Sequence, residues 1–162
     1  TLEKVRQALF NVLAQWGLPQ GCRVLDLYAG SGALGIEALS RGAAHVTFVE
    51  ADARAVAGIR ANLKALGVAR EQAQVLPVRV LAWLKRPAPE PVGLVTLDPP
   101  YAGDEAALLL QALPAWPGLA PGAVLVAEIA ARHPSLPTGE LEVLSSKRYG
   151  DTRLIFLRKG AS

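Results

Sequence analysis

The fold is decided by residues 23–50, which read RVLDLYAGSGALGIEALSRGAAHVTFVE. Residues 23–28 form a short apolar run, typical of a buried strand, and a glycine-rich segment over 29–35 follows it. A helical stretch then runs to about residue 42, and the next run, 45–50, again has the composition of a strand. The stretch therefore predicts a strand, a glycine turn, a helix and a second strand, which open a βαβ unit.

Strands and helices continue to alternate along the rest of the chain. This order implies right-handed βαβ units, so we predict an open, doubly wound α/β sheet that is mostly parallel and covered by helices on both faces. Such sheets bind ligands at the carboxyl ends of their strands. The predicted helices cover residues 2–16, the stretch that ends near 42, 52–66, 80–85 and 105–113, and the seven predicted strands cover 23–28, 45–50, 74–76, 92–97, 123–128, 141–146 and 153–157.

Composition limits the class of protein. The chain has 162 residues, of which 51% are hydrophobic and 19% are charged, so we expect one soluble domain over 1–162. No run of about 18 apolar residues is present to span a membrane. The net charge of +3 permits a polyanionic partner without requiring one. Because the chain begins with Thr1 and contains no Met, we expect that a natural N-terminal segment is missing from it.

Cysteine and histidine are scarce. The single cysteine, Cys22, cannot form an internal disulfide, and with two histidines the chain lacks the Cys/His cluster of a structural zinc site. We therefore expect no metal, and a reducing cytoplasm as the compartment.

The glycine turn matches a nucleotide-binding fingerprint. Gly30, Gly32 and Gly35 have the spacing G-x-G-x-x-G, and Glu50 lies twenty residues beyond Gly30, where a carboxylate binds ribose hydroxyls. The pattern predicts a cofactor that contains a nucleoside. The alternative is that the glycines serve only a tight turn.

Asp26 separates two classes of cofactor. A dinucleotide places a pyrophosphate against the glycine turn, whereas S-adenosylmethionine brings an ammonium group and a sulfonium cation. A carboxylate four residues before Gly30 disfavours the first ligand and favours the second. Length agrees, because a dehydrogenase normally has a catalytic domain for which this chain has no room. In the alternative interpretation, Asp26 only organises the amides of the turn.

The tetrapeptide Asp98-Pro99-Pro100-Tyr101 follows a predicted strand and so lies beside the expected cofactor. The prolines fix φ and cannot donate hydrogen bonds, so the Pro99 carbonyl and the Asp98 carboxylate are preset acceptors for an exocyclic amine. Tyr101 offers an aromatic face on which an extruded base can stack. The alternative is a Pro-Pro turn with Tyr101 in the core.

On these motifs the sequence resembles the class I S-adenosylmethionine-dependent methyltransferases, and more narrowly the bacterial 16S ribosomal RNA guanine-N2 methyltransferases. The resemblance implies a Rossmann-like domain whose mostly parallel sheet has an antiparallel strand. It also implies S-adenosylmethionine as cofactor, S-adenosylhomocysteine as product, and a monomer that acts on the small ribosomal subunit or its 16S RNA. The stretches that carry it are residues 5–11, 25–43, 49–50, 98–101 and 149–152.

Carried over by position, the resemblance implies three groups of site residues. The catalytic group is Asp98, Pro99 and Tyr101; the cofactor-binding group is Asp26, Tyr28, Gly30, Ser31, Gly32, Glu50, Ala51, Arg79 and Val80; the substrate-binding group is Pro100, Tyr101, Lys147, Arg148 and Tyr149. Two features depart from the family pattern. Residues 77–80 lack the Asp or Asn with which many relatives bind the adenine amine, and no basic segment precedes the first helix.

The turn over residues 147–151 is a candidate RNA contact. If the sixth strand runs parallel to the others and the seventh returns antiparallel, this turn lies at the cofactor edge, and Lys147 and Arg148 can face RNA phosphates. The alternative is an ordinary hairpin turn with exposed charges.

Two other functions remain open. A DNA adenine-N6 methyltransferase uses the same tetrapeptide, but Asp98 favours guanine, whose N1–H and N2 amine are all donors. A non-catalytic nucleotide-binding module, such as an NAD sensor, is the other possibility. Tight S-adenosylhomocysteine binding without NAD binding would exclude that module.

Overall fold

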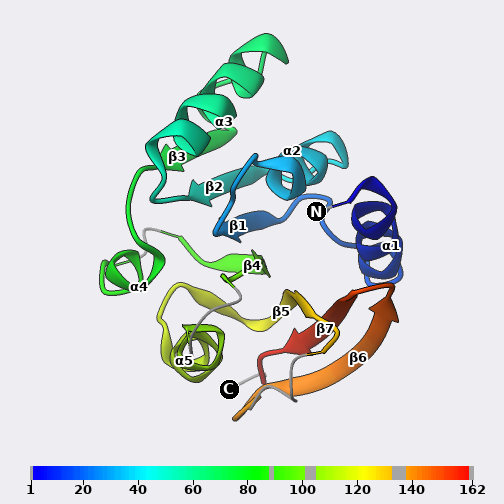
Figure 1. Cartoon of the computed structure of the whole chain (residues 1–162). Helices are drawn as coiled ribbons and strands as arrows, with labels where there is room; N and C mark the ends of the chain where they lie inside the picture. The colour runs from blue at the N-terminus through cyan, green and yellow to red at the C-terminus, as the bar shows by residue number, and fades with distance from the viewer. Residues whose placement is uncertain (1, 88–89, 101–104, 133–137, 161–162) are drawn as a thin grey trace.

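A computed structural model describes residues 2–87, 90–100, 105–132 and 138–160, and its centre is a seven-stranded sheet (Figure 1). The strand order is β3-β2-β1-β4-β5-β7-β6, and every neighbouring pair is parallel except the two pairs that β7 forms with β5 and β6. The predicted α/β class, with a mostly parallel sheet and an antiparallel strand, is confirmed. The strands are β1 Arg23–Leu27, β2 His45–Val49, β3 Ala73–Leu76, β4 Val92–Leu97, β5 Leu119–Ala130, β6 Glu142–Tyr149 and β7 Thr152–Arg158.

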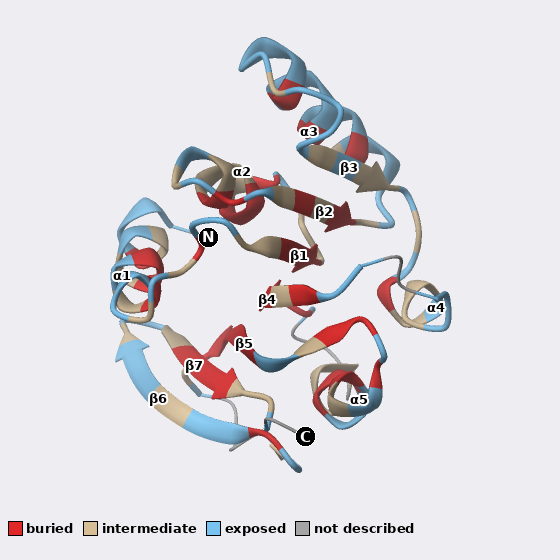
Figure 2. Cartoon of the chain, turned by 180° about the vertical axis from the view of Figure 1, so that it is seen from behind, coloured by how far each residue is buried: buried red, intermediate tan, exposed pale blue. Residues whose placement is uncertain are grey.

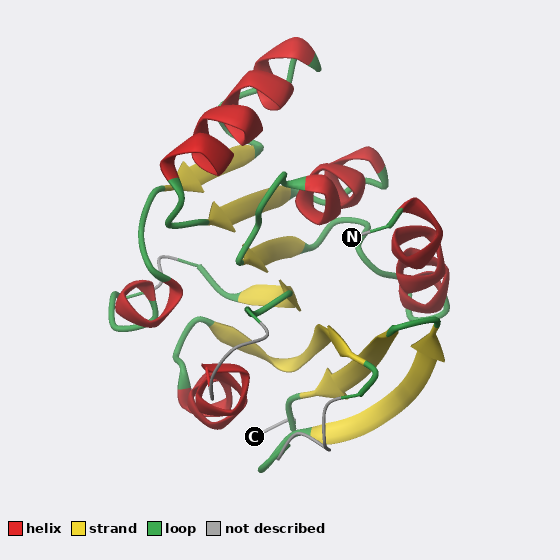
Figure 3. Ribbon diagram, viewed as in Figure 1, coloured by secondary structure: helices red, strands yellow, loops and turns green. Residues whose placement is uncertain are grey.

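Helices cover both faces of the sheet, as Figure 3 shows. One face is covered by the first three helices and the other by the last two and a short 3₁₀ helix. The first set is α1 Glu3–Ala14, α2 Ala33–Ser40 and α3 Ala53–Ala65; the second set is α4 Val80–Trp83, α5 Glu105–Ala112 and η1 Leu113–Ala115. No helix in these described ranges is long and apolar enough to cross a membrane.

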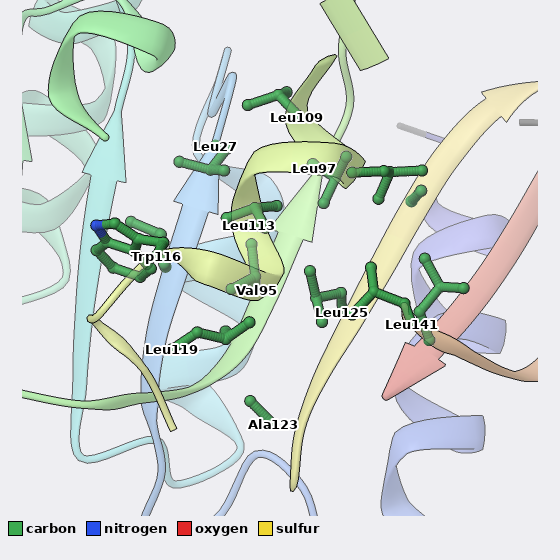
Figure 4. Close-up of a cluster of buried hydrophobic side chains, with 14 of the residues drawn as sticks. Leu27, Val95, Leu97, Leu109, Leu113, Trp116, Leu119, Ala123, Leu125 and Leu141 are labelled. Atoms are coloured by element: carbon green, nitrogen blue, oxygen red, sulfur yellow. The ribbon is translucent and has the colours of Figure 1, made fainter. Parts of the chain in front are cut away.

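The hydrophobic core has two layers because successive side chains of a strand point to opposite faces. Val95 and Leu125 belong to the layer beneath α5, which Figure 4 shows, whereas Leu94 and Val124 belong to the layer beneath α1 and α2. The central strands are therefore buried on both faces, as Figure 2 shows, which is typical of parallel sheets.

Gly35 lets α2 pack closely against the sheet. A Cβ atom at this position would lie 2.2 Å from a ring carbon of Phe48 on β2, far inside van der Waals contact. The third glycine of the fingerprint is thus required for helix–strand packing.

The strand β5 is longer than predicted. It begins at Leu119 instead of residue 123, and it includes Pro121 and Gly122, residue types that are uncommon inside a strand. The pairing with β4 shifts register between Val92 and Leu94, so an irregularity in the strand accommodates these two residues. The other boundaries differ from prediction by three residues or fewer, within the usual uncertainty for element ends.

Candidate cofactor and substrate site

Three central strands end together at one edge of the sheet. β1, β2 and β4 run parallel, and Leu27 lies beside Val49 on one side and Leu97 on the other. The residues that follow these strands therefore meet: the glycine turn after β1, Glu50 after β2 and Asp98 after β4. The structure brings together the motifs on which the sequence analysis depends.

The turn between β1 and α2 has a backbone that favours glycine. Gly30 has a φ of 57° and Gly32 a φ of 80°, and the Gly32 N–H donates a hydrogen bond to the Ala29 carbonyl at 2.8 Å. Tyr28 also has a positive φ, 57°, which is uncommon for a residue with a Cβ atom. A Cβ on Gly32 would lie 3.0 Å from Ile59 on α3. The turn therefore presents mainly backbone to a ligand.

Glu50 connects this turn to the end of β2. Its Oε1 accepts a hydrogen bond from the Gly30 N–H at 2.8 Å, and its Oε2 accepts one from the Asp52 N–H at 2.9 Å. A carboxylate has about four acceptor positions, so two remain for hydroxyl groups of a ligand. The predicted ribose-binding residue is thus held in place by two backbone amides.

Asp26 is buried beneath the turn, with 2% of its surface exposed. Its two carboxyl oxygens accept hydrogen bonds from the Gly35 N–H at 3.1 Å and from the Thr96 hydroxyl at 3.0 Å. Burial raises the pKa of Asp26 to about 7, although these two hydrogen bonds lower it. The contacts favour the interpretation in which Asp26 organises the start of α2. Because the pKa of this carboxyl group lies near neutrality, the group is only partly ionised at neutral pH. It therefore favours S-adenosylmethionine over a dinucleotide less strongly than predicted.

Asp98 follows β4 at the same edge and is itself followed by the buried Pro99 and the exposed Pro100. Burial raises the pKa of the Asp98 carboxyl to about 6, and the negative charge of Glu128 adds to this effect. Asp98 is therefore mostly ionised at neutral pH, yet is a stronger base than an exposed aspartate. Tyr101, the third predicted catalytic residue, lies outside the described residues.

Glu128 on β5 lies beside Asp98 and is not among the residues predicted from the sequence. Leu97 pairs with Ala127, so the next residues of the two parallel strands, Asp98 and Glu128, are neighbours across the β4–β5 pair. Glu128 is buried, with 8% of its surface exposed. One signal was available in the sequence, since Glu128 is a charged residue between Ala127 and Ile129 in an otherwise apolar strand.

The remaining predicted cofactor residues have different exposures. Ser31 and Ala51 are exposed beside the glycine turn and Glu50, and Arg79 is exposed at the N-cap of α4. The Val80 side chain is buried in the core and is therefore not available to contact a cofactor. Tyr28 packs against the same core, and burial together with the nearby Glu105 carboxylate raises the pKa of its phenol.

The turn between β6 and β7 lies at the same edge of the sheet as the glycine turn. β7 is antiparallel to both of its neighbours, so Thr152 pairs with Ala130 at the carboxyl end of β5 and with Tyr149 at the end of β6. The predicted location of this turn is confirmed. Side chains alternate along β6, however, so Lys147 and Arg148 point to opposite faces of the sheet. Tyr149 packs against the core layer beneath α1.

The described residues contain no group of three or more His, Cys, Asp or Glu side chains arranged to hold a metal ion. A cavity of about 520 Å³ runs along α2 to Leu66 and Gly67, so most of it opens beside the helices and away from the strand ends.

Comparisons with known proteins agree with this geometry. The model of the family described as conserved hypothetical protein 95 matches residues 1–158. The Haemophilus influenzae protein named ribosomal RNA small subunit methyltransferase D is 35% identical over 151 residues, which are 93% of this chain and 77% of that protein.

Two solved structures have the same fold. A conserved hypothetical protein from Streptococcus pyogenes is 30% identical, with a TM-score of 0.84 over 95% of this chain and 94% of that one. An RNA methyltransferase from Salinibacter ruber, in complex with S-adenosyl-L-homocysteine, is 17% identical, with a TM-score of 0.77 over 100% of this chain and 94% of that one. The chain therefore belongs to the conserved hypothetical protein 95 family, together with the relatives named ribosomal RNA small subunit methyltransferase D, and has the Rossmann-like fold of methyltransferases.

Proposed function

We propose that this chain transfers a methyl group from S-adenosylmethionine to the exocyclic N2 amine of a guanine in 16S ribosomal RNA, in the bacterial cytoplasm. The observation that carries the proposal is that Asp98 and Pro99 follow β4 at the edge where the glycine turn and Glu50 also lie. Family membership favours methyl transfer to ribosomal RNA as the class of reaction.

In this proposal the cofactor lies across the ends of β1 and β2. Glu50 accepts hydrogen bonds from the ribose hydroxyls with the acceptor positions that its two amide contacts leave open. Asp26 acts through Gly35 by holding the start of α2. The glycine turn, with Tyr28, Gly30, Ser31 and Gly32, holds the methionine part, and Ala51, Arg79 and Val80 surround the adenine, which backbone groups recognise.

Asp98 and the Pro99 carbonyl orient the guanine amine. By accepting its two hydrogens they draw the N2 lone pair out of conjugation and aim it at the methyl carbon. The lone pair forms the new nitrogen–carbon bond while the carbon–sulfur bond breaks in line, and the electron pair of the broken bond stays on sulfur as S-adenosylhomocysteine. One N2 proton then leaves to Asp98 or to water. A carboxylate with a pKa of about 6 is suited to accept it near neutral pH.

The substrate residues favour guanine in RNA. Guanine presents N1–H beside its amine, and a carboxylate accepts from both, whereas adenine presents an acceptor that a carboxylate repels. The proposed substrate group is completed by Pro100, Tyr101 and Tyr149, which contact the base and its neighbours, and by Lys147 and Arg148, which face backbone phosphates from opposite faces of β6.

The proposal is tested by product identity. The protein is incubated with labelled S-adenosylmethionine and small subunits from a strain that lacks the modification, and the RNA is digested to nucleosides. We expect the label in N2-methylguanosine. Label in N6-methyladenine of added DNA would instead identify the DNA enzyme. Binding of NAD with no methyl transfer to any substrate would identify a nucleotide-binding module.

A further inference from the structure

A hollow of about 320 Å³ opens at the carboxyl end of β5, beside the β6–β7 turn. The Ala131 N–H donates a hydrogen bond to the Asp151 carbonyl at 2.7 Å, which joins the segment after β5 to this turn. Arg132 and Arg148, which belong to these two separate segments, therefore line the same hollow. The lining residues are Ala130, Ala131, Arg132, Arg148 and Asp151.

The charge of the hollow matches a phosphodiester. Within the described residues neither Arg132 nor Arg148 forms an ion pair, and with Asp151 the two cations leave a formal charge of +1. The Arg148 Nε donates a hydrogen bond to the Gly150 carbonyl at 2.7 Å, which holds the guanidinium at the turn, and four N–H donors remain on that group. A phosphodiester carries one negative charge, and its paired oxygens fit the planar donor fork of arginine.

The position of the hollow fits a strand whose target base lies at Asp98. Neighbouring strands of a sheet are about 4.8 Å apart, and the hollow extends from β5, next to β4, to β6, which is two strands further. It therefore lies about 5 to 15 Å from Asp98 along the sheet edge. Phosphates follow each other about every 3.4 Å along the axis of a stacked strand, so the hollow is within reach of phosphates one to four nucleotides from the target.

We propose that this hollow binds one backbone phosphate of the RNA strand, close to the nucleotide whose guanine enters the site at Asp98. The inference rests on the proposed function, because it takes RNA as the substrate. It assigns a role to Arg132, pairs it with Arg148, and separates both from Lys147, which lies on the opposite face of β6.

The test compares Arg132→Gln and Arg148→Gln with Arg70→Gln, a control that removes an exposed charge from the loop between α3 and β3, at the amino end of the strands. In methylation of small subunits, each hollow variant should raise the KM for the subunit about three- to tenfold while kcat and S-adenosylhomocysteine affinity stay unchanged. In binding of naked 16S RNA, each should reduce the slope of log affinity against log salt by about 0.7.

A third variant tests the sign of the charge effect. Among the described residues that line the hollow, Asp151 is the one anion. Asp151→Asn removes its charge and should therefore lower the KM for the subunit, which a merely structural role would not do. Values of KM and salt slope that match those of Arg70→Gln in both arginine variants would overturn the proposal. A change with assembled subunits but none with naked RNA would also overturn it, since the partner would then be a ribosomal protein. If the wild type methylates no ribosomal RNA, the proposed function itself fails, which is a separate result.

Discussion

The two halves of the sheet differ in how their strand ends are held. In the half that contains β1, β2 and β4, side chains fix the backbone of the turns: Glu50 accepts from Gly30, and Asp26 accepts from Gly35. In the half that contains β5, β7 and β6, β7 is antiparallel to both of its neighbours and most of β6 is exposed (Figure 2). The Arg148 and Arg153 side chains donate hydrogen bonds within the β6–β7 hairpin. The first half is preorganised for a small cofactor, whereas the second presents exposed cations suited to a large polyanion.

The largest effect is expected where the two halves meet, at the end of β4. In the proposed mechanism, Asp98→Ala removes a positioned acceptor whose hydrogen bond strengthens toward the transition state. The single-turnover rate should therefore fall by about 10² to 10³, or about 2.7 to 4 kcal/mol, by analogy with loss of one oxyanion donor. S-adenosylhomocysteine binding, measured by calorimetry, should change little.

Asp98→Asn is the matched control, because it keeps the size and shape of the side chain and removes its charge. The amide offers one acceptor and places a donor toward N1–H of guanine, so this variant should be faster than Asp98→Ala and slower than the wild type. A wild-type rate in Asp98→Ala, or a defect that arises only from lost cofactor binding, would contradict the assigned role.

The second-largest effect is expected in the preorganised half, which contains β1, β2 and β4. Glu50→Ala removes the charged acceptor of the Gly30 amide and, in the proposed site, of the ribose, so S-adenosylhomocysteine affinity should fall by about 1.5 to 3 kcal/mol in calorimetry. Glu71→Ala, an exposed carboxylate in the loop before β3, is the control. Equal affinities in the two variants would show that the ribose lies elsewhere.

A stability measurement separates the packing role of Gly35, the third glycine of the G-x-G-x-x-G motif, from the role of this motif in cofactor binding. Gly35→Ala places a Cβ against the Phe48 ring and should reduce the free energy of unfolding by about 1 to 3 kcal/mol, as overpacking does. Gly58→Ala on α3 meets no atom within 4 Å, so it should raise stability by about 0.5 to 1 kcal/mol. Urea denaturation of both variants gives the comparison, and equal signs would contradict it.

The preorganised half was also the more predictable one. Periodicity placed β4 at its observed bounds, and the spacing from Gly30 to Glu50 anticipated a residue that reaches the turn. Local patterns could not show that Asp26 would bond to Thr96, seventy residues away, because a sequence does not state which strands are neighbours. Glu128 was missed for the same reason, because only the register between β4 and β5 shows that it lies beside Asp98.

The smallest expected effect concerns Glu128, which the register between β4 and β5 places beside Asp98 at the boundary between the two halves. In the proposed mechanism the ionised Asp98 carboxylate accepts from the guanine amine, and protonation weakens it as an acceptor, so the rate should rise with pH through its pKa of about 6. Glu128→Gln removes a negative charge beside Asp98, which makes the ionised form less costly and lowers the pKa. The acid limb of the profile should therefore move to lower pH, by less than about one unit because burial, the larger cause, remains.

The profile is measured as single-turnover methylation between about pH 5 and 8, with Glu142→Gln on the exposed strand β6 as the control. A residue that only supports the fold would lower the rate at every pH and leave the midpoint in place. An unmoved midpoint in Glu128→Gln, or a midpoint at higher pH, would mean that Glu128 does not act on the charge of Asp98. In that case β5 would influence the reaction through packing alone. The charges of the half that contains β5, β7 and β6 would then have no effect on the ionisation of Asp98.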